Sequence, residues 1–390
     1  MLLKAKILVS LALWCVLPSE LGAQLARVPD EASWRADIDQ GTALRDGELY
    51  SEAAAVFERA LEKAESFGPN DVRVPVTLNS LALVHHLRKD FEQAGPLYER
   101  SAELLRIALG PDHPEIAKIL SSLYELYMQQ GKLDAAERGG LDRLAILEKQ
   151  LGKLNPQLVQ PLADVSLVYF SKNQLLDAEH YQRRSLAISQ AGGSETDPEK
   201  ATGLSNLGVI LAADNRLANA VEALNESLRL RQSGSPESIE VARDLAHLAD
   251  AYGKRLQFAE AELLLTRSLE LRRKHLTSKD AEIAVALNNL GELYRLQREY
   301  DRAEENLRAA VAVWEAVNGP GDIETGVSLY NLAALFEEQN RLDEAAPLFG
   351  RAAAVMEQKL GPSNQRSQQV REAFDSVCAR VNAISCAAVR

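Results

Sequence analysis

Apolar and polar positions along this chain repeat with a period of 41 or 42 residues. Within each period, two segments have apolar residues three and four positions apart, a spacing typical of amphipathic helices. A period this regular predicts a stack of similar units, each of which buries its apolar face against its neighbours. One alanine marks the eight periods, at Ala53, Ala94, Ala136, Ala178, Ala220, Ala261, Ala303 and Ala345.

Residues 282–323 show one unit most clearly. Its first predicted helix has an apolar face that runs from Val285 to Tyr294, and its second has one that runs from Tyr300 to Trp314. Gly319 and Pro320 then end the second helix, because glycine tolerates the turn that follows a helix and proline cannot continue one. Each unit is therefore predicted to be a helical hairpin.

Small residues recur where two helices of a hairpin must approach closely. A leucine followed by a small residue marks the first helix, as at Leu290 and Gly291, and an alanine followed seven residues later by a second small residue marks the second helix. This pattern resembles the tetratricopeptide repeat. The links at 109–114 (LGPDHP) and 360–365 (LGPSNQ) resemble those of the 42-residue repeats of kinesin light chains.

The resemblance implies an all-α fold, a right-handed solenoid of about eight helix-turn-helix hairpins over residues 34–365. Residues 366–390 then form a capping helix and tail. Apolar residues at helical spacing from Val370 to Ile384 place the capping helix at about 367–385.

The N-terminus differs from the repeats. Lys4 and Lys6 precede an apolar run from Ile7 to Leu17, and Gly22 and Ala23 follow. This arrangement is typical of a secretory signal peptide over residues 1–23, with a linker over residues 24–33. We therefore expect an exported protein, periplasmic or secreted, that has no membrane span once the signal is cleaved.

Charge and cysteine content narrow the picture further. The net charge of −12 argues against a nucleic-acid partner. After the predicted signal, the cysteines are Cys378 and Cys386. A disulfide between them requires the capping helix to end before Cys386, since eight residues of straight helix hold them about 12 Å apart. The predicted helix over 367–385 favours the alternative, two separate thiols.

The resemblance also implies where a partner binds, because the first helices of such hairpins line the concave surface. The residue before the core leucine points into that groove, and so does the residue four positions earlier. The candidate peptide-binding residues at or next to these two positions are Asn79, Asn206, Arg243, His247, Asn289 and Asn331. Asn79 lies one residue before the first of these positions, and Arg243 occupies the second. An asparagine amide donates and accepts, so it can pair with a peptide backbone. Alternatively, the amides bond to neighbouring helices, and Arg243 forms an ion pair with Asp250.

The sequence contains no pattern that indicates catalysis. None of the six histidines lies in a metal-binding arrangement, and repeat packing accounts for every segment that precedes the tail. We therefore expect a monomeric, non-catalytic scaffold without a cofactor or a metal, which binds a protein or extended peptide in its groove. The alternative is an accessory or regulatory subunit that presents a substrate to a separate envelope or secretion enzyme.

Overall fold

The computed structural model of the chain describes residues 30–68, 70–191, 198–277, 280–381 and 386. These residues form 17 α-helices and one 3-10 turn, and no strand occurs among them. The all-α fold predicted from the periodicity is therefore confirmed. The predicted signal peptide lies outside the described residues.

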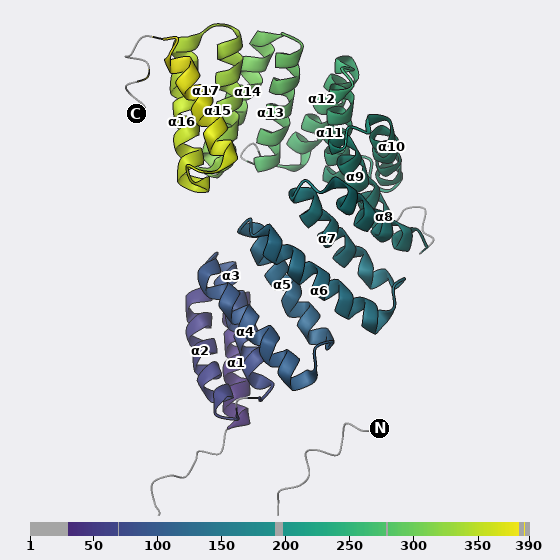
Figure 1. The fold of residues 1–390 in the computed structure, drawn as a ribbon, viewed down its shortest axis with the longest axis vertical. Coiled ribbons are helices and arrows are strands. Elements are labelled where there is room, and N and C mark those ends of the chain that lie inside the picture. The colour runs from purple at the N-terminus through teal and green to yellow at the C-terminus, as the bar shows by residue number, and fades with distance from the viewer. Residues whose placement is uncertain (1–29, 69, 192–197, 278–279, 382–385, 387–390) are drawn as a thin grey trace, which may run out of the picture. The chain divides into compact units, whose positions relative to one another are not determined.

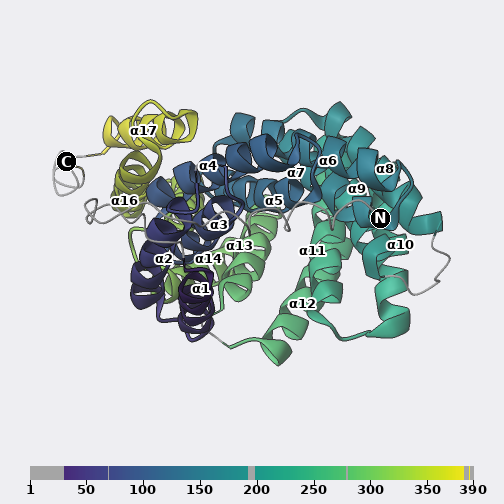
Figure 2. The same ribbon diagram turned by 90° about the horizontal axis from the view of Figure 1, so that it is seen from below.

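The helices fall into two compact units, Met1–Gly131 and Lys132–Arg390. In the first unit, α1 and α2 form one hairpin, α3 and α4 form a second, and α2 packs on α3 (Figure 2). The helices of this unit are α1 (Glu31–Asp46), α2 (Tyr50–Glu65), α3 (Arg73–Leu87), α4 (Phe91–Leu109) and α5 (Pro114–Gln129) (Figure 1).

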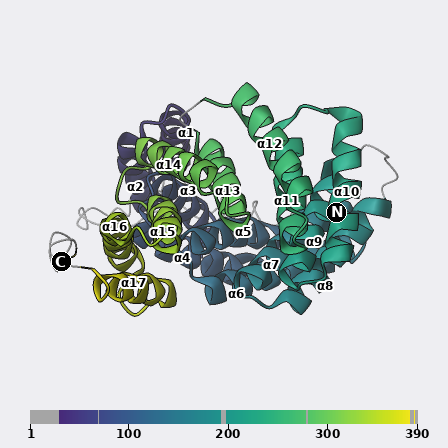
Figure 3. The same ribbon diagram turned by 90° about the horizontal axis from the view of Figure 1, so that it is seen from above.

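In the second unit every helix packs on the next one along the chain (Figure 3). From α7 onward its helices form five hairpins and one capping helix, as the repeat pattern predicts. The elements of this unit are α6 (Leu133–Leu151), the 3-10 turn η1 (Pro156–Leu158), α7 (Val159–Ser171), α8 (Leu175–Ala191), α9 (Pro198–Ala213), α10 (Leu217–Gly234), α11 (Ile239–Lys254), α12 (Phe258–His275), α13 (Ala281–Leu296), α14 (Tyr300–Val317), α15 (Ile323–Glu338), α16 (Leu342–Leu360) and α17 (Gln365–Cys378).

The turn between the two helices of a hairpin has the same backbone conformation in each repeat. One residue adopts a left-handed conformation, with φ between 57° and 67°. The next helix starts within a few residues, so the two helices of a hairpin that lies within one unit run antiparallel. The residues in this position are Glu48, Lys89, Gly131, Asn173, Asn215, Leu256, Arg298 and Asn340.

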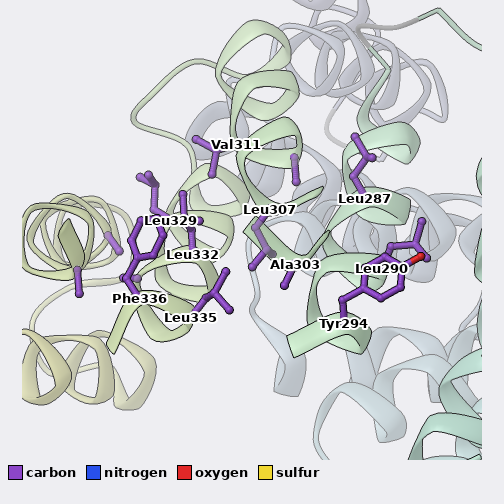
Figure 4. Close-up of a cluster of buried hydrophobic side chains, with 14 of the residues drawn as sticks. Leu287, Leu290, Tyr294, Ala303, Leu307, Val311, Leu329, Leu332, Leu335 and Phe336 are labelled. Atoms are coloured by element: carbon purple, nitrogen blue, oxygen red, sulfur yellow. The ribbon is translucent and has the colours of Figure 1, made fainter. Parts of the chain in front are cut away.

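The small residues of the first helices permit the close contact within each hairpin. A Cβ atom added to Gly291 lies 2.6 Å from Cγ of Leu307, and one added to Gly208 lies 2.5 Å from Cγ of Leu224. Figure 4 shows Leu307 between the side chains of α13 and α15 in the cluster that contains Leu290 and Leu332. Hydrophobic burial of this kind is the main stabilising contribution to the stack.

The second small position has a role that spacing alone does not reveal. Where it is a serine, the hydroxyl donates a hydrogen bond to a carbonyl oxygen of the first helix, 26 residues earlier in the chain. These bonds join Ser101 to Pro75 (2.6 Å), Ser185 to Val159 (2.8 Å), Ser227 to Ala201 (2.7 Å) and Ser268 to Ala242 (2.6 Å). The serine therefore links the two helices of a hairpin by a hydrogen bond.

The C-terminal cap differs from the sequence expectation. Helix α17 ends at Cys378 rather than near residue 385. Cys378 and Cys386 form a disulfide, and their Cα atoms are 5.8 Å apart. The expectation of two separate thiols is therefore wrong, because the helix ends at Cys378 instead of continuing to residue 385.

Candidate functional site

A groove in the second unit brings together three of the six predicted binding residues. We call it the α11–α13 groove, since it is lined by α11 and α13, with contributions from α9 and α12. Its volume is about 880 Å³. Arg243 and His247, four residues apart on α11, line the groove. Asn289 lines it from the facing helix, α13.

The charged side chains of this groove pair with one another. Arg243 Nη2 lies 2.9 Å from Glu282 Oε1, and Nε of the buried Arg272 lies 3.3 Å from the other oxygen of Glu282. Asp250 pairs instead with Lys254, at 2.8 Å. The alternative considered for Arg243, an ion pair with Asp250, is therefore wrong. Glu282, seven residues before Asn289 on the neighbouring α13, is the partner of Arg243.

His247 belongs to a buried polar network behind the groove. Ser205 Oγ donates to Oδ1 of Asp244 (2.7 Å) and lies 3.2 Å from His247 Nδ1. The one hydroxyl proton of Ser205 goes to Asp244, so His247 Nδ1 carries the proton of the second bond. Burial lowers the pKa of His247, although the nearby Asp244 carboxylate opposes that effect. The imidazole is therefore neutral at pH 7.

Asp244 itself holds α10 against α11. The side chain is 1% exposed and accepts hydrogen bonds from Ser205 Oγ and Arg231 Nε (2.9 Å). It also lies 2.5 Å from Ser227 Oγ, whose single proton is shared with the carbonyl oxygen of Ala201. These contacts position the side chains around the carboxylate. Sequence reasoning missed Asp244, whose signal was a charged residue on the core-facing side of an amphipathic helix.

Asn289 and Asn331 occupy the same position in consecutive repeats but have different surroundings. Asn331 Nδ2 donates to Oδ1 of Asn288 on the preceding repeat, at 3.1 Å. The residue that faces Asn289 in the equivalent place is Ala246, which has no polar side chain. Among the residues that the structure describes, none hydrogen-bonds to the Asn289 side chain. Asn331 therefore links two helices, whereas Asn289 presents its amide to the groove.

A second pair of equivalent positions distinguishes the open surface from a closed one. Arg295 at the end of α13 pairs with Glu292 and with Glu338 of α15. In the groove, the corresponding residues are Gly253 and Leu296. The hydrogen-bonded carboxylates raise the pKa of Arg295 above its ordinary value. Glycine and leucine therefore stand in the groove where the next interface has a charged bridge.

The remaining predicted residues lie elsewhere. Asn206 lines a smaller cavity of about 180 Å³ that it shares with Ala163, so an alanine again faces an asparagine. Asn79 is half-buried on α3, in the first unit. The structure therefore brings Arg243, His247 and Asn289 together and places the three other asparagines outside that group.

The described residues contain neither a candidate metal site nor a candidate membrane span. No cluster of three or more histidine, cysteine or acidic side chains there has an arrangement that could bind a metal ion. None of the described helices contains a segment that is both long enough and apolar enough to cross a membrane.

Solved structures are similar to this chain, and two with TM-scores above 0.5 support the hairpin architecture. A tetratricopeptide repeat protein from Parabacteroides merdae aligns with a TM-score of 0.54 and 16% identity, covering 74% of this chain and 98% of its own. The apo form of RapI aligns with a TM-score of 0.53 and 12% identity, covering 89% and 98%. A putative kinesin light chain from Podosopora anserina, with nearly identical TPR-like repeats, aligns at 0.45 and 20% identity, covering 52% and 97%.

Sequence comparison identifies the repeats themselves. No curated protein sequence matches the chain. A family model described as tetratricopeptide repeat matches residues 73–149, 199–274 and 282–358, more than half of the chain. These segments contain six of the eight left-handed turns described above. The chain belongs to the tetratricopeptide-repeat family.

Proposed function

We propose that this protein is an exported, monomeric and non-catalytic scaffold that holds an extended segment of a protein partner in the α11–α13 groove. The observation that carries the proposal is the amide of Asn289. It lies in a groove of about 880 Å³, opposite Ala246, with no hydrogen-bond partner among the described residues. An amide with free donors and acceptors in a concave surface suits the backbone of an extended chain.

The surroundings of Asn289 support the same role. Arg243 and Glu282 pair with each other in the groove, and Val285, which also lines it, is 40% exposed. A partner segment then meets alternating polar and apolar groups along α11 and α13. Small-molecule catalysis has no comparable support, because the histidine of the groove is tied to Ser205.

Two features support export. Residues 1–23 have the composition of a signal peptide. The disulfide between Cys378 and Cys386 is of a kind that persists in oxidising compartments. The mature chain is then expected to begin at Gln24, and N-terminal sequencing of the protein from its native host tests this. A chain that retains Met1 in the cytosolic fraction contradicts the export proposal.

Site-specific photo-cross-linking tests binding in the groove. We would place a photoreactive phenylalanine analogue at Val285 and, as a matched control, at Leu263, which is 73% exposed on α12 outside the groove. A protein partner that cross-links at Val285 and not at Leu263 supports the proposal. Equal labelling at the two sites, or no labelling at Val285, contradicts it.

A second variant closes the groove without removing any of the predicted binding residues. The double substitution Gly253→Arg and Leu296→Glu copies the Arg295–Glu338 bridge of the next interface. We expect the variant to remain helical and to lose the cross-linked partner. A partner that is bound with unchanged affinity by this variant lies outside the groove.

A further inference from the structure

The turn between α11 and α12 contains a residue that its backbone conformation does not favour. Leu256 has φ of 60°, in the left-handed region, where a side chain with a Cβ is strained. Its side chain is 74% exposed and lines the α11–α13 groove. Leu256 therefore contributes little to the core, while its conformation costs stability.

The equivalent turn positions show that leucine is not needed for the fold. The other seven turns have a polar or charged residue or a glycine there, and three have asparagine, which tolerates this conformation well. The turn of the preceding repeat has Asn215 in this position, and the turn of the next repeat has Arg298. Stability therefore does not explain the exposed leucine at this turn, and we look to binding for its role.

Gly253, three residues earlier, is a second departure from what stability favours. It lies within α11, where glycine is less favourable than alanine. A Cβ atom added there meets no other atom within 4 Å, so packing does not require glycine. The absence of a side chain leaves space in the groove next to the Leu256 turn.

The charges of the groove indicate what kind of segment fits this space. Each charged side chain that lines it has an opposite charge within 4 Å, as in the pairs Lys254–Asp250 and Arg295–Glu292. A partner therefore needs no counter-charge here. Val285 and Leu296 are 40% and 50% exposed in the same groove, so the available surface near Leu256 is apolar.

We propose that Leu256 is a partner-contacting residue, and that the bound segment places a large uncharged apolar side chain over Gly253 and against Leu256. This inference rests on the proposed binding of a segment in the groove and names its chemistry. Burial of leucine and its apolar counterpart supplies affinity, and the strain at the turn is the stability cost of presenting that side chain.

A displayed library of random dodecapeptides tests the proposal on the full mature chain. Selection on the wild type is followed by counter-selection on the closed-groove variant Gly253→Arg/Leu296→Glu, and the affinity of each survivor is measured by fluorescence anisotropy. We expect survivors to share a leucine, isoleucine or phenylalanine and to bind Leu256→Asn about tenfold more weakly. The melting temperature of Leu256→Asn should equal or exceed that of the wild type, because asparagine relieves the strain.

Arg298→Asn is the matched control, since it makes the same change at the same turn position of the next repeat. It should raise stability similarly and leave peptide affinity within twofold of the wild type. Survivors without a shared apolar residue, or with unchanged affinity for Leu256→Asn, overturn this inference while leaving the groove function intact. The absence of any survivor overturns both. Self-association of the wild type that Leu256→Asn abolishes assigns the surface to a second copy of the chain and also overturns the inference.

Discussion

The α11–α13 groove and the adjoining surface between α13 and α15 are built from equivalent repeat positions, yet they differ in the polar bridges that cross them. Between α13 and α15, Asn331 donates to Asn288 and Arg295 pairs with Glu338. Between α11 and α13, Ala246 and Gly253 occupy the positions of Asn288 and Arg295. Both polar bridges are therefore missing from the groove.

The difference shows that the repeat separates its fold from its binding surface. The buried small and leucine positions are alike in both regions, as Ala249 and Leu248 correspond to Gly291 and Leu290. The bridging positions lie at the edge of that core. Changing a few of them opens or closes a surface without altering the hairpins, which suits a family defined by architecture rather than by one ligand.

The largest predicted effect concerns the buried carboxylate that supports the groove wall. Asp244→Ala copies the next repeat, which has Ala286 in that position. In the groove repeat it leaves the mostly buried Arg231 guanidinium without its carboxylate. We expect the free energy of unfolding to fall by about 3 kcal/mol, measured by urea denaturation. A loss below about 1 kcal/mol would show that Arg231 finds another partner and that the network does not hold the wall.

The next prediction opens the closed surface. The double substitution Arg295→Gly and Glu338→Leu introduces the groove residues between α13 and α15. It removes a partly buried ion pair and adds a glycine to a helix, so we expect a loss of about 2 kcal/mol in the free energy of unfolding. Hydrogen exchange should locate the loss in α13 and α15. Exchange that rises equally in every hairpin would contradict a local effect.

The sequence predicts the hairpins well because the period determines which residues are buried. It also predicts that residues such as His247 and Asn289 face one surface. It cannot tell whether an amide in that position is occupied, because the answer depends on its neighbour one repeat away: Asn288 for Asn331 and Ala246 for Asn289. The partner of Arg243 was missed for the same reason, since Glu282 lies 39 residues along the chain.

The two asparagines offer a more sensitive test of the comparison. Asn331→Ala breaks the bond to Asn288 and should cost about 1 kcal/mol. Asn289→Ala breaks no bond within the described chain and should change the free energy of unfolding by less than about 0.5 kcal/mol. Chemical denaturation of the two variants measures both values. Equal costs would mean that Asn289 has a structural partner and would weaken its assignment to ligand binding.

A reciprocal substitution strengthens that test. Ala246→Asn supplies the acceptor that Asn288 provides in the next repeat, so Asn289 should donate to it. We expect a gain of about 0.5 kcal/mol that disappears when Asn289→Ala is added. Asn306→Ala is the control, because that exposed amide on α14 bonds only to its own helix among the described residues. A gain that persists in the presence of Asn289→Ala would contradict the predicted bridge.

The smallest predicted effect separates the two surfaces by pH. His247 and Asn331 hold equivalent positions, and each bonds to the preceding repeat, but only His247 titrates. Burial lowers the pKa of His247 below its ordinary value of 6.5, so the unfolded chain binds this proton more readily than the folded chain. The free energy of unfolding therefore falls as the pH drops through about 6.5, and the His247 contribution is fully present above that value. Urea denaturation of the wild type and of His247→Asn between pH 5 and pH 8 measures the difference, which cancels the titration of other groups. A difference that is independent of pH, or one that favours the wild type more at low pH, would show that the imidazole is not held neutral by the buried network behind the groove.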